Sequence, residues 1–423
     1  MTNPKADLLA HLESMAARYQ DRWTLSACGV TVGRRSIPAL LDKNANSPGL
    51  NTASVLLISG LSGNPDDVAL ARRSLDSTPS DGAGPGNHIS LSAIPDCNPD
   101  GLRDLSTGYP PIGEFFYNAE EPEKRYLWRW ICFLAPTLIL ELRSGEAVSW
   151  QSNEAGNNLA SALARSGGRV ENESLLDSLG SGSPDGLGPI PGLRLTSPPE
   201  SLDDELSKLW KRLSEQPGLR QASPARQVLE ARSARSHLEV AHILASVYGY
   251  QLDPVNYTQG VGISGRLQLY ELSKTGESPA SGIVDLVEPY VSGSTPMFGE
   301  RVGGANLAGL IWGRELSAAT GDPRYSDLIV AVANRYQPGV DGGAPPPCDP
   351  DFRTEDMFMA GAMLGRAFGI TGETKYLDLL VGFITGGNIQ QESGLFWHCR
   401  PAHFYWSRGN GFAAMGLTET LTY

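Results

Sequence analysis

The sequence predicts two domains of different fold class: an α/β domain built on an open sheet, followed by an all-α domain of helical hairpins. The chain has 423 residues, and at roughly 100–200 residues per domain this length suggests two or three domains. Strand and helix patterns alternate over the first 150 residues, as in a sheet with helices on its faces. After about residue 226 the apolar residues recur with a helical period to the end of the sequence.

The elements of the α/β domain follow from short apolar runs bounded by turn residues. We expect strands at 24–32, 54–60, 88–94 and 137–142, and helices at 1–23, 65–76 and 126–134. The composition changes at 166–199, which is rich in Gly, Ser and Pro, and residues 180–192 within it are predicted to form a surface loop or linker. A short amphipathic helix is expected at 202–213. We therefore place the first domain at 1–218 and the second at 219–423.

The second domain contains a weak internal repeat. Three segments each read as a helix, a Thr-Gly turn and a second helix, with Thr275, Thr320 and Thr371 at corresponding places. The Gly suits a left-handed helix C-cap, and one hairpin about every 45–50 residues predicts a repeat-type α/α architecture. A closed toroid of six hairpins needs roughly 270–300 residues. The sequence therefore predicts a truncated, unclosed barrel, whose open apolar side would favour self-association.

Composition and charge exclude two classes of partner. The formal net charge is −13, so a surface that binds nucleic acid phosphates is not expected. No apolar run approaches the roughly 18 residues of a membrane helix, and the N-terminus lacks the apolar core of a secretory signal. The five cysteines form no CxxC pair, which predicts free thiols in a reducing compartment. Together these features predict a cytoplasmic protein.

Four short motifs stand in order in the first domain. They are GRRSIP at 33–38, SGLSGN at 59–64, NPDG at 98–101 and LELRS at 140–144. In this order they resemble the motifs of the zinc carboxypeptidase superfamily, which implies a carboxypeptidase-like α/β fold. The family binds zinc through His and Glu, but the corresponding positions here are Ser62, Pro65 and Arg143. A hydroxyl, a proline and a guanidinium cannot form a His2Glu zinc site.

The missing ligands leave several interpretations of this domain. The first is a peptidase-like domain without metal, which serves as a scaffold or binds a ligand. In that case Arg143 is a candidate for binding a carboxylate. The alternative is a working metallocarboxypeptidase whose zinc ligands have moved to other positions.

Two segments of the second domain contain candidate functional residues. Glu355 and Asp356 begin a predicted helix, where acids commonly complement the helix dipole. Downstream, 394–398 (GLFWH) and 406–412 (WSRGNGF) bring His398, Trp406 and Arg408 close together in the sequence. Aromatic faces with Arg and Asn donors form a common way to hold a sugar acid. A loop fixed by its own hydrogen bonds would explain the same residues.

In this order the two segments resemble the unsaturated glycuronyl and rhamnogalacturonyl hydrolases, glycoside hydrolase families 88 and 105. The resemblance implies an (α/α)-type barrel that hydrates the C4=C5 double bond of a terminal unsaturated uronic acid, so the substrate would be an unsaturated uronic-acid oligosaccharide of the pectin (rhamnogalacturonan) type. It implies no metal and no cofactor. By the resemblance, Asp356 acts as general acid and then base, and His398 and Arg408 contact the uronate. Trp406 stacks on the sugar, and Asn410 binds a hydroxyl or orders the loop.

One departure keeps a second interpretation of the whole chain open. The family has a second acidic residue at the start of an earlier helix, and the corresponding segment here, 300–306 (ERVGGAN), contains Glu300 but no Asp. A non-catalytic protein, with both domains decayed and used for binding or assembly, therefore remains the alternative to a carbohydrate-active hydrolase.

Overall fold

The computed structural model of the chain describes residues 4–46, 52–77, 88–113, 120–162, 167–181, 186–300 and 302–423. The chain divides into two compact units, Met1–Ala234 and Arg235–Tyr423. The sequence placed this division at 218/219, before helix α7 (Pro224–Ser233). The helix belongs to the first unit because Ala225 is buried in its core and Arg226 donates a 2.8 Å hydrogen bond to the carbonyl oxygen of Ala45.

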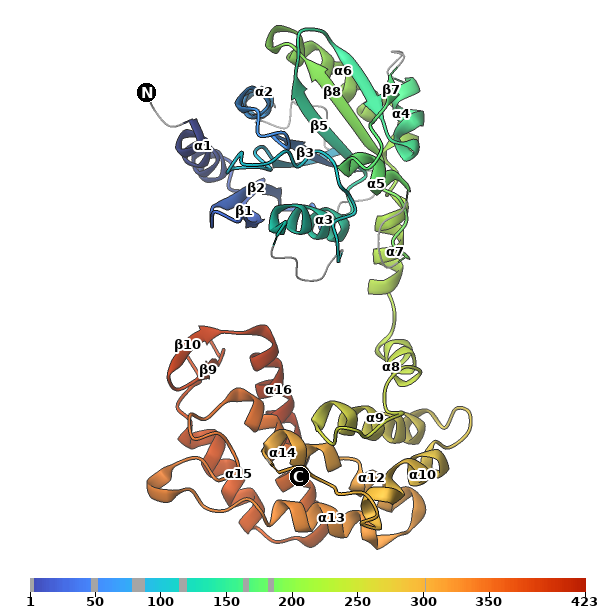
Figure 1. Cartoon of the computed structure of the whole chain (residues 1–423), viewed down its shortest axis with the longest axis vertical. Helices are drawn as coiled ribbons and strands as arrows, with labels where there is room; N and C mark the ends of the chain where they lie inside the picture. The colour runs from blue at the N-terminus through green and yellow to red at the C-terminus, as the bar shows by residue number, and fades with distance from the viewer. Residues whose placement is uncertain are drawn as a thin grey trace. The chain divides into compact units, whose positions relative to one another are not determined.

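The first unit is built on an eight-stranded sheet in the described part of the chain, with strand order β1-β2-β4-β3-β5-β8-β6-β7 (Figure 1). The central strands β4, β3, β5 and β8 run parallel, and antiparallel pairs join β1, β2 and β6 to them. The strands are β1 Trp23–Val30, β2 Ser36–Asp42, β3 Ala53–Ser59, β4 Ile89–Ile94, β5 Leu138–Ser144, β6 Ser149–Ser152, β7 Gly168–Arg169 and β8 Gly192–Ser197.

Helices cover both faces of this sheet. Strand β3 shows why, because Val55 and Leu57 face one core while Leu56 and Ile58 face the other, as side chains alternate along a strand. The first core packs against α1 (Pro4–Arg18), α2 (Pro65–Asp76), α4 (Asn157–Ala162) and α6 (Leu202–Glu215). The second packs against α3 (Pro122–Leu134), α5 (Leu175–Ser181) and α7. The unit is therefore a three-layer α/β/α domain.

The loop predicted at 180–192 is confirmed for residues 187–191, although its first two residues end α5 and its last begins β8; residues 182–185 lie outside the described part. The wider Gly-, Ser- and Pro-rich segment 166–199 also contains β7, and β8 pairs with β5 inside the sheet. Because the segment is rich in Gly and Ser, two apolar patterns in it were not recognised from the sequence. They are Leu175, Leu176 and Leu179 on one helix face, and Leu193 and Leu195 alternating along β8. All five side chains are fully buried, so packing outweighs composition here.

The second unit consists mainly of helical hairpins. The predicted helix–turn–helix repeats are confirmed as α9–α10 (Tyr257–Ser273, Ala280–Val291), α12–α13 (Gly313–Thr320, Pro323–Ala333) and α14–α15 (Thr354–Thr371, Lys375–Gly386). Gly321 and Gly372 are the left-handed C-caps of α12 and α14, with φ of 77° and 74°. In the first repeat Lys274 takes this conformation instead, at φ 50°, and Gly276 follows it at φ 79°.

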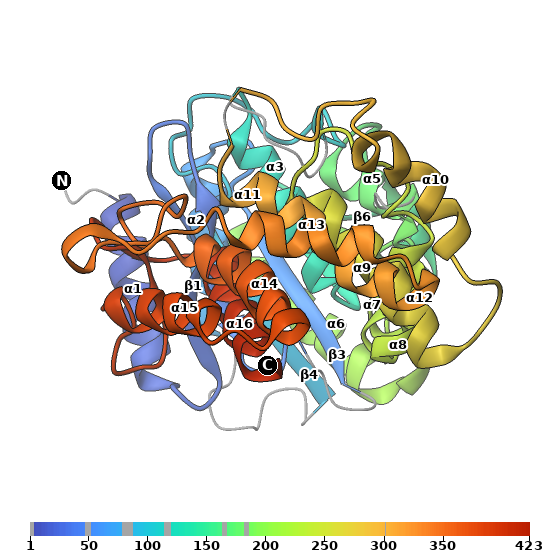
Figure 2. The same cartoon turned by 90° about the horizontal axis from the view of Figure 1, so that it is seen from below.

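Helix α14 is the most deeply buried helix of this unit, and it packs against α15 and α16 (Ser407–Thr422) (Figure 2). The described helical elements of this unit also include α8 (His237–Ala245), α11 (Gly304–Leu307) and the 3-10 turns Ala308–Leu310 and Val340–Gly342. The structure shows a helix-rich unit, and the closed or open state of a barrel stays a prediction. Leu238, Ile243 and Leu244 of α8 are exposed, and self-association of this unit likewise stays a prediction.

The contact between α14 and α16 depends on Gly416, which supplies the first stability prediction. A Cβ added at Gly416 would lie 2.4 Å from the backbone carbonyl of Met357, whereas one added at Gly411 on the same helix meets nothing within 4 Å. We expect Gly416→Ala to destabilise the second unit by about 1–3 kcal/mol or more. We expect Gly411→Ala to be neutral or to stabilise by up to ~1 kcal/mol, since Ala favours a helix over Gly. Urea unfolding of both variants checks this pair, and equal midpoints would contradict the packing.

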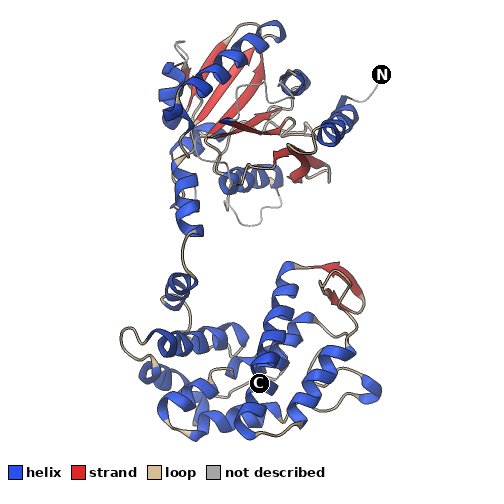
Figure 3. Ribbon diagram, turned by 180° about the vertical axis from the view of Figure 1, so that it is seen from behind, coloured by secondary structure: helices blue, strands red, loops and turns tan. Residues whose placement is uncertain are grey.

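The expectation of an all-α second domain needs one correction. Strands β9 (Trp397–Cys399) and β10 (Ala402–Tyr405) form an antiparallel pair (Figure 3). Aromatic residues, which favour strands, stand here in two short runs, Phe396-Trp397 and Phe404-Tyr405-Trp406, too short to be separated from the helical pattern around them. The predicted site residue His398 therefore lies on a strand.

Two other expectations can be compared with the described residues. Within them, no helix combines the length and the apolar character needed to cross a bilayer. All five cysteines are free and buried, as the sequence predicted for isolated thiols.

Candidate functional site

The positions that correspond to zinc ligands lie near the carboxyl ends of β3 and β5. The Ser62 hydroxyl donates a 3.0 Å hydrogen bond to Asp67, Pro65 is the first residue of α2, and Arg143 lies on β5. Among the described residues no group of three His, Cys, Asp or Glu side chains could hold a metal ion. This donor set does not fit zinc, so no chemistry is derived through a metal.

Ion pairs fill this edge of the sheet instead. The carboxylate of Glu141 accepts from Nε of Arg143 at 2.6 Å and from Nε of Arg194 at 3.0 Å, and Glu141 and Arg194 are each 1% exposed. Arg194 also pairs with Glu171. The Nη2 atoms of Arg143 and Arg194 are buried without a hydrogen-bond partner in the described part of the chain.

The NPDG motif of the first unit contacts two of the other three motifs, GRRSIP and SGLSGN. The carboxylate of Asp100 accepts from the backbone N–H of Gly33 at 2.9 Å and pairs with Arg35 at 3.4 Å. Asn98 accepts from the N–H of Gly101 at 3.1 Å and donates to the carbonyl oxygen of Leu61. These motifs therefore fix loops beside the sheet and do not present free side chains.

In the second unit, Asp356 lies in the first turn of α14 and is 7% exposed. Its Oδ2 accepts a 2.8 Å hydrogen bond from the N–H of Asp349, and a Cβ added at Gly304 would meet its Oδ1 at 2.8 Å. Burial raises the pKa of Asp356 to about 6, and the hydrogen bond from Asp349 opposes this rise. Gly304 belongs to the segment 300–306, which corresponds to the place of the family's second acidic residue. This segment therefore lies against Asp356 at Gly304, while its only acid, Glu300, is exposed.

The acid that contacts the predicted sugar-binding residues is Glu355. Its Oε1 lies 3.3 Å from Nε2 of His398, and its Oε2 accepts a 3.2 Å hydrogen bond from Thr354. Arg353 is the N-cap of this helix, and Thr354 is its first helical residue. Sequence reasoning assigned Glu355 only to the helix dipole, because no spacing rule links it to a strand 43 residues later.

An aromatic cluster surrounds His398. The ring of Phe404 stacks on it with centroids 5.3 Å apart, and Trp406 meets it edge-on at 5.3 Å. Arg408 lies over the Trp406 ring at 4.1 Å. The structure therefore brings His398, Trp406, Arg408 and Glu355 together, while Asp356 lies one residue further on the same helix turn.

Asn410 has a positioning role in this arrangement. Its Oδ1 accepts from the N–H of Phe396 at 2.8 Å, and its Nδ2 donates to the carbonyl oxygens of Phe396 and Trp406 at 3.0 and 3.3 Å. These bonds occupy both ends of the amide, so Asn410 orders the loop, one of the two roles expected for it. Gly409 is required next to it, since a Cβ there would lie 2.8 Å from Thr354 Oγ1.

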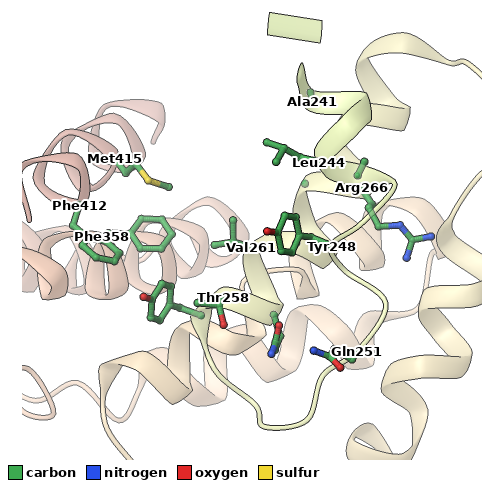
Figure 4. Close-up of a pocket in the computed structure, with 15 residues that line it drawn as sticks. Ala241, Leu244, Tyr248, Gln251, Thr258, Val261, Arg266, Phe358, Phe412 and Met415 are labelled. Carbon is green, nitrogen blue, oxygen red and sulfur yellow. The ribbon is translucent and has the colours of Figure 1, made fainter. Parts of the chain in front are cut away.

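A pocket of about 730 Å³ lies elsewhere in the same unit, between α8, α9, α14 and α16 (Figure 4). Phe358, Phe412 and Met415 form one wall, and Leu244 and Tyr248 face them across the opening. Phe412 packs edge-on against Tyr257 at 5.5 Å. This lining is mainly apolar and none of the predicted site residues belongs to it, so the polar chemistry of the unit gathers at His398.

Comparison with known proteins gives matches to solved structures only. No family model matches the sequence, and a search of curated proteins finds no relative. A metallo-carboxypeptidase from Burkholderia cenocepacia is 12% identical, with a TM-score of 0.36, over 53% of this chain and 68% of that one. A metallo-carboxypeptidase from Pseudomonas aeruginosa is 12% identical, with a TM-score of 0.37, over 50% of this chain and 68% of that one. Carboxypeptidase A from Helicoverpa armigera is 16% identical, with a TM-score of 0.34, over 53% and 74%. Structure neighbours of this chain are thus metallo-carboxypeptidase-like over about half of its length, and with TM-scores below 0.5 nothing about its activity is drawn from them.

Proposed function

We propose that the second unit is a carbohydrate-active hydrolase that hydrates the C4=C5 double bond of terminal unsaturated uronic acids in rhamnogalacturonan-type oligosaccharides. The observation that supports this most is the pair of acids at the start of α14. Asp356 is buried with its pKa raised to about 6, and the neighbouring Glu355 is paired with His398. A general acid is most effective when its pKa lies near the working pH.

The reaction needs one proton donor and a site for the uronate. Asp356 protonates C4, the positive charge that develops at C5 is captured by water, and the resulting hemiketal opens and releases the neighbouring sugar. Asp356 takes up the proton from the attacking water, so one carboxyl group serves as acid and then as base. Arg408 is exposed, with no hydrogen bond or ion pair to the described residues beyond its contact with Trp406. Its guanidinium is thus available for the carboxylate of the substrate.

The test is the ultraviolet absorbance of an unsaturated rhamnogalacturonan disaccharide, which falls when the conjugated double bond is hydrated. Purified protein is expected to remove this absorbance and to release the second sugar. A folded protein that leaves the absorbance unchanged would contradict the proposal and would favour the non-catalytic interpretation of the chain.

A specific observation favours a second candidate function for the first unit, the binding of a carboxylate ligand. Arg143 is one-quarter exposed, and its buried Nη2 lacks a partner in the described part of the chain. A ligand carboxylate could complete its hydrogen bonding. Isothermal titration calorimetry with a dipeptide that has a free C-terminal carboxylate should show binding to the wild type. Arg143→Ala should abolish this binding. Equal affinity in the variant would end this proposal, and binding that requires added zinc would support a peptidase with moved ligands instead.

A further inference from the structure

The hairpin β9–β10 contains an irregularity that places Phe404 beside the site. Ala402 pairs with Cys399 and Tyr405 pairs with Trp397, so two residues of β10, His403 and Phe404, oppose the single residue His398 of β9. This arrangement is a β-bulge, and bulges re-aim side chains next to functional sites.

The side chains of the two bulge residues, His403 and Phe404, contact different partners. His403 stacks on Trp397 with ring centroids 3.7 Å apart, whereas Phe404 stacks on His398. Tyr405 is directly opposite Trp397, and directly opposed residues of a strand pair point to the same face of the sheet. Phe404 therefore lies on the His398 face, and Tyr405 lies on the other.

Exposure increases outward from the two acids. Asp356 is 7% exposed, the side chains of His398 and Glu355 are 17% and 20% exposed, and Phe404 is 53% exposed. His398 stacks on the ring of Phe404, and the exposed half of Phe404 leaves an apolar surface at the outer end of the site. An aromatic ring in such a place offers a large apolar contact area to a ligand.

We infer that Phe404 stacks on the sugar that is released, the residue next to the terminal unsaturated uronate. This inference rests on the proposed function. The terminal uronate occupies the inner end, near Glu355 and His398, and the exposed Arg408, which lies over Trp406, can reach its carboxylate. The rest of the oligosaccharide must then extend toward solvent. The second sugar ring would lie next to Phe404 and stack on its exposed apolar face.

The test compares two substrates on two matched variants. One substrate is the unsaturated disaccharide, and the other is the methyl glycoside of the same unsaturated uronic acid, which lacks the second ring. Phe404→Ala should raise KM for the disaccharide about 3- to 10-fold, as expected for the loss of one stacking contact, and leave KM for the methyl glycoside unchanged. Tyr405→Ala, which removes a ring that is 55% exposed on the other face, should change neither value.

Further variants and outcomes separate the inference from the proposal on which it rests. Phe404→Tyr keeps the ring and should restore the KM of the disaccharide. If the wild type hydrates both substrates but Phe404→Ala changes neither KM, or raises both equally, Phe404 does not bind the released sugar. If the wild type hydrates neither substrate, the proposed function fails, and this inference fails with it. Both positions are exposed, so circular dichroism should show native folding in each variant.

Discussion

Replacing Asp356 with Asn is expected to lower the rate of hydration of the unsaturated disaccharide by roughly 10²- to 10⁴-fold, the usual contribution of general acid–base catalysis. The reason is that Asn fills nearly the same space and can accept the hydrogen bond from Asp349, but it has no proton to deliver to C4. The loss should appear in kcat, because the proposed reaction gives Asp356 the proton transfer and gives the binding of the uronate to other residues. Initial rates from ultraviolet absorbance check this directly.

Two controls make the result specific to Asp356. Asp378 lies in the first turn of α15 and is exposed, so Asp378→Asn removes an acid that only complements a helix dipole and should not affect turnover. Glu355→Gln should weaken the placement of His398 and raise KM more than it lowers kcat. If Glu355→Gln abolishes turnover while Asp356→Asn keeps it, the proton donor is Glu355 and the assignment of Asp356 is wrong.

The raised pKa of Asp356 also predicts how the stability of the second unit depends on pH. The folded-state pKa is about 6, against an ordinary value of 3.8, so the folded chain holds this proton more tightly than the unfolded chain. The stabilisation is fully present below about pH 4 and is lost as the pH rises to 6 and above. The difference in pKa corresponds to about 3 kcal/mol.

Asp356→Asn should therefore make the second unit more stable at pH 7.5 and have an effect only about one-third as large at pH 4.5, even though it removes activity. Thermal unfolding of the two proteins at both pH values measures this difference. A variant that is less stable than the wild type at pH 7.5 would show that the ionised carboxylate is not destabilising in this environment. A gain in stability together with a loss of activity is the pattern expected of a functional residue kept at a cost to the fold.

The sequence was sufficient for elements whose signals are local. The Thr-Gly turns predicted three hairpins because each requires a left-handed cap at a fixed place, and the apolar run at 54–60 predicted the strand β3, which is buried along its whole length. The sequence was insufficient for elements whose structure depends on packing against distant parts of the chain. Strand β8 contains only six residues in a segment rich in Gly and Pro, and its place between β5 and β6 depends on partners about 40 to 55 residues earlier in the chain.

The same distinction holds for the candidate site. His398, Trp406 and Arg408 could be found from sequence because they are separated by few residues and share unusual chemistry. Glu355 and Phe404 could not, since one is selected by a contact between a helix and a distant strand and the other by a β-bulge. Asn410 was found, but only the structure shows that its amide is fully used by the loop.

Removing the charge of Glu141 is expected to cause the largest loss of stability in the first unit. Glu141→Gln leaves the guanidinium groups of Arg143 and Arg194 without their shared buried carboxylate, and Arg194 is 1% exposed. Breaking a buried ion pair by removing one partner costs about 3–5 kcal/mol, because the remaining charge stays desolvated. Glu171 cannot replace it fully, since its side chain is half exposed and its interaction is weakened by solvent.

The measurement is urea unfolding, and the two units must be followed separately because a chain with two cores need not unfold in one step. Gly416→Ala identifies the transition of the second unit, so Glu141→Gln should shift the other one. Glu154→Gln is the matched control, since Glu154 and Arg169 are mostly exposed and 3.8 Å apart, and such pairs contribute about 0–1 kcal/mol. If the two variants behave alike, the pairs around Glu141 are not what stabilises this edge of the sheet. Adding Arg194→Met to Glu141→Gln should restore much of the loss, because the cost comes from the unpaired buried guanidinium and not from the missing contact itself.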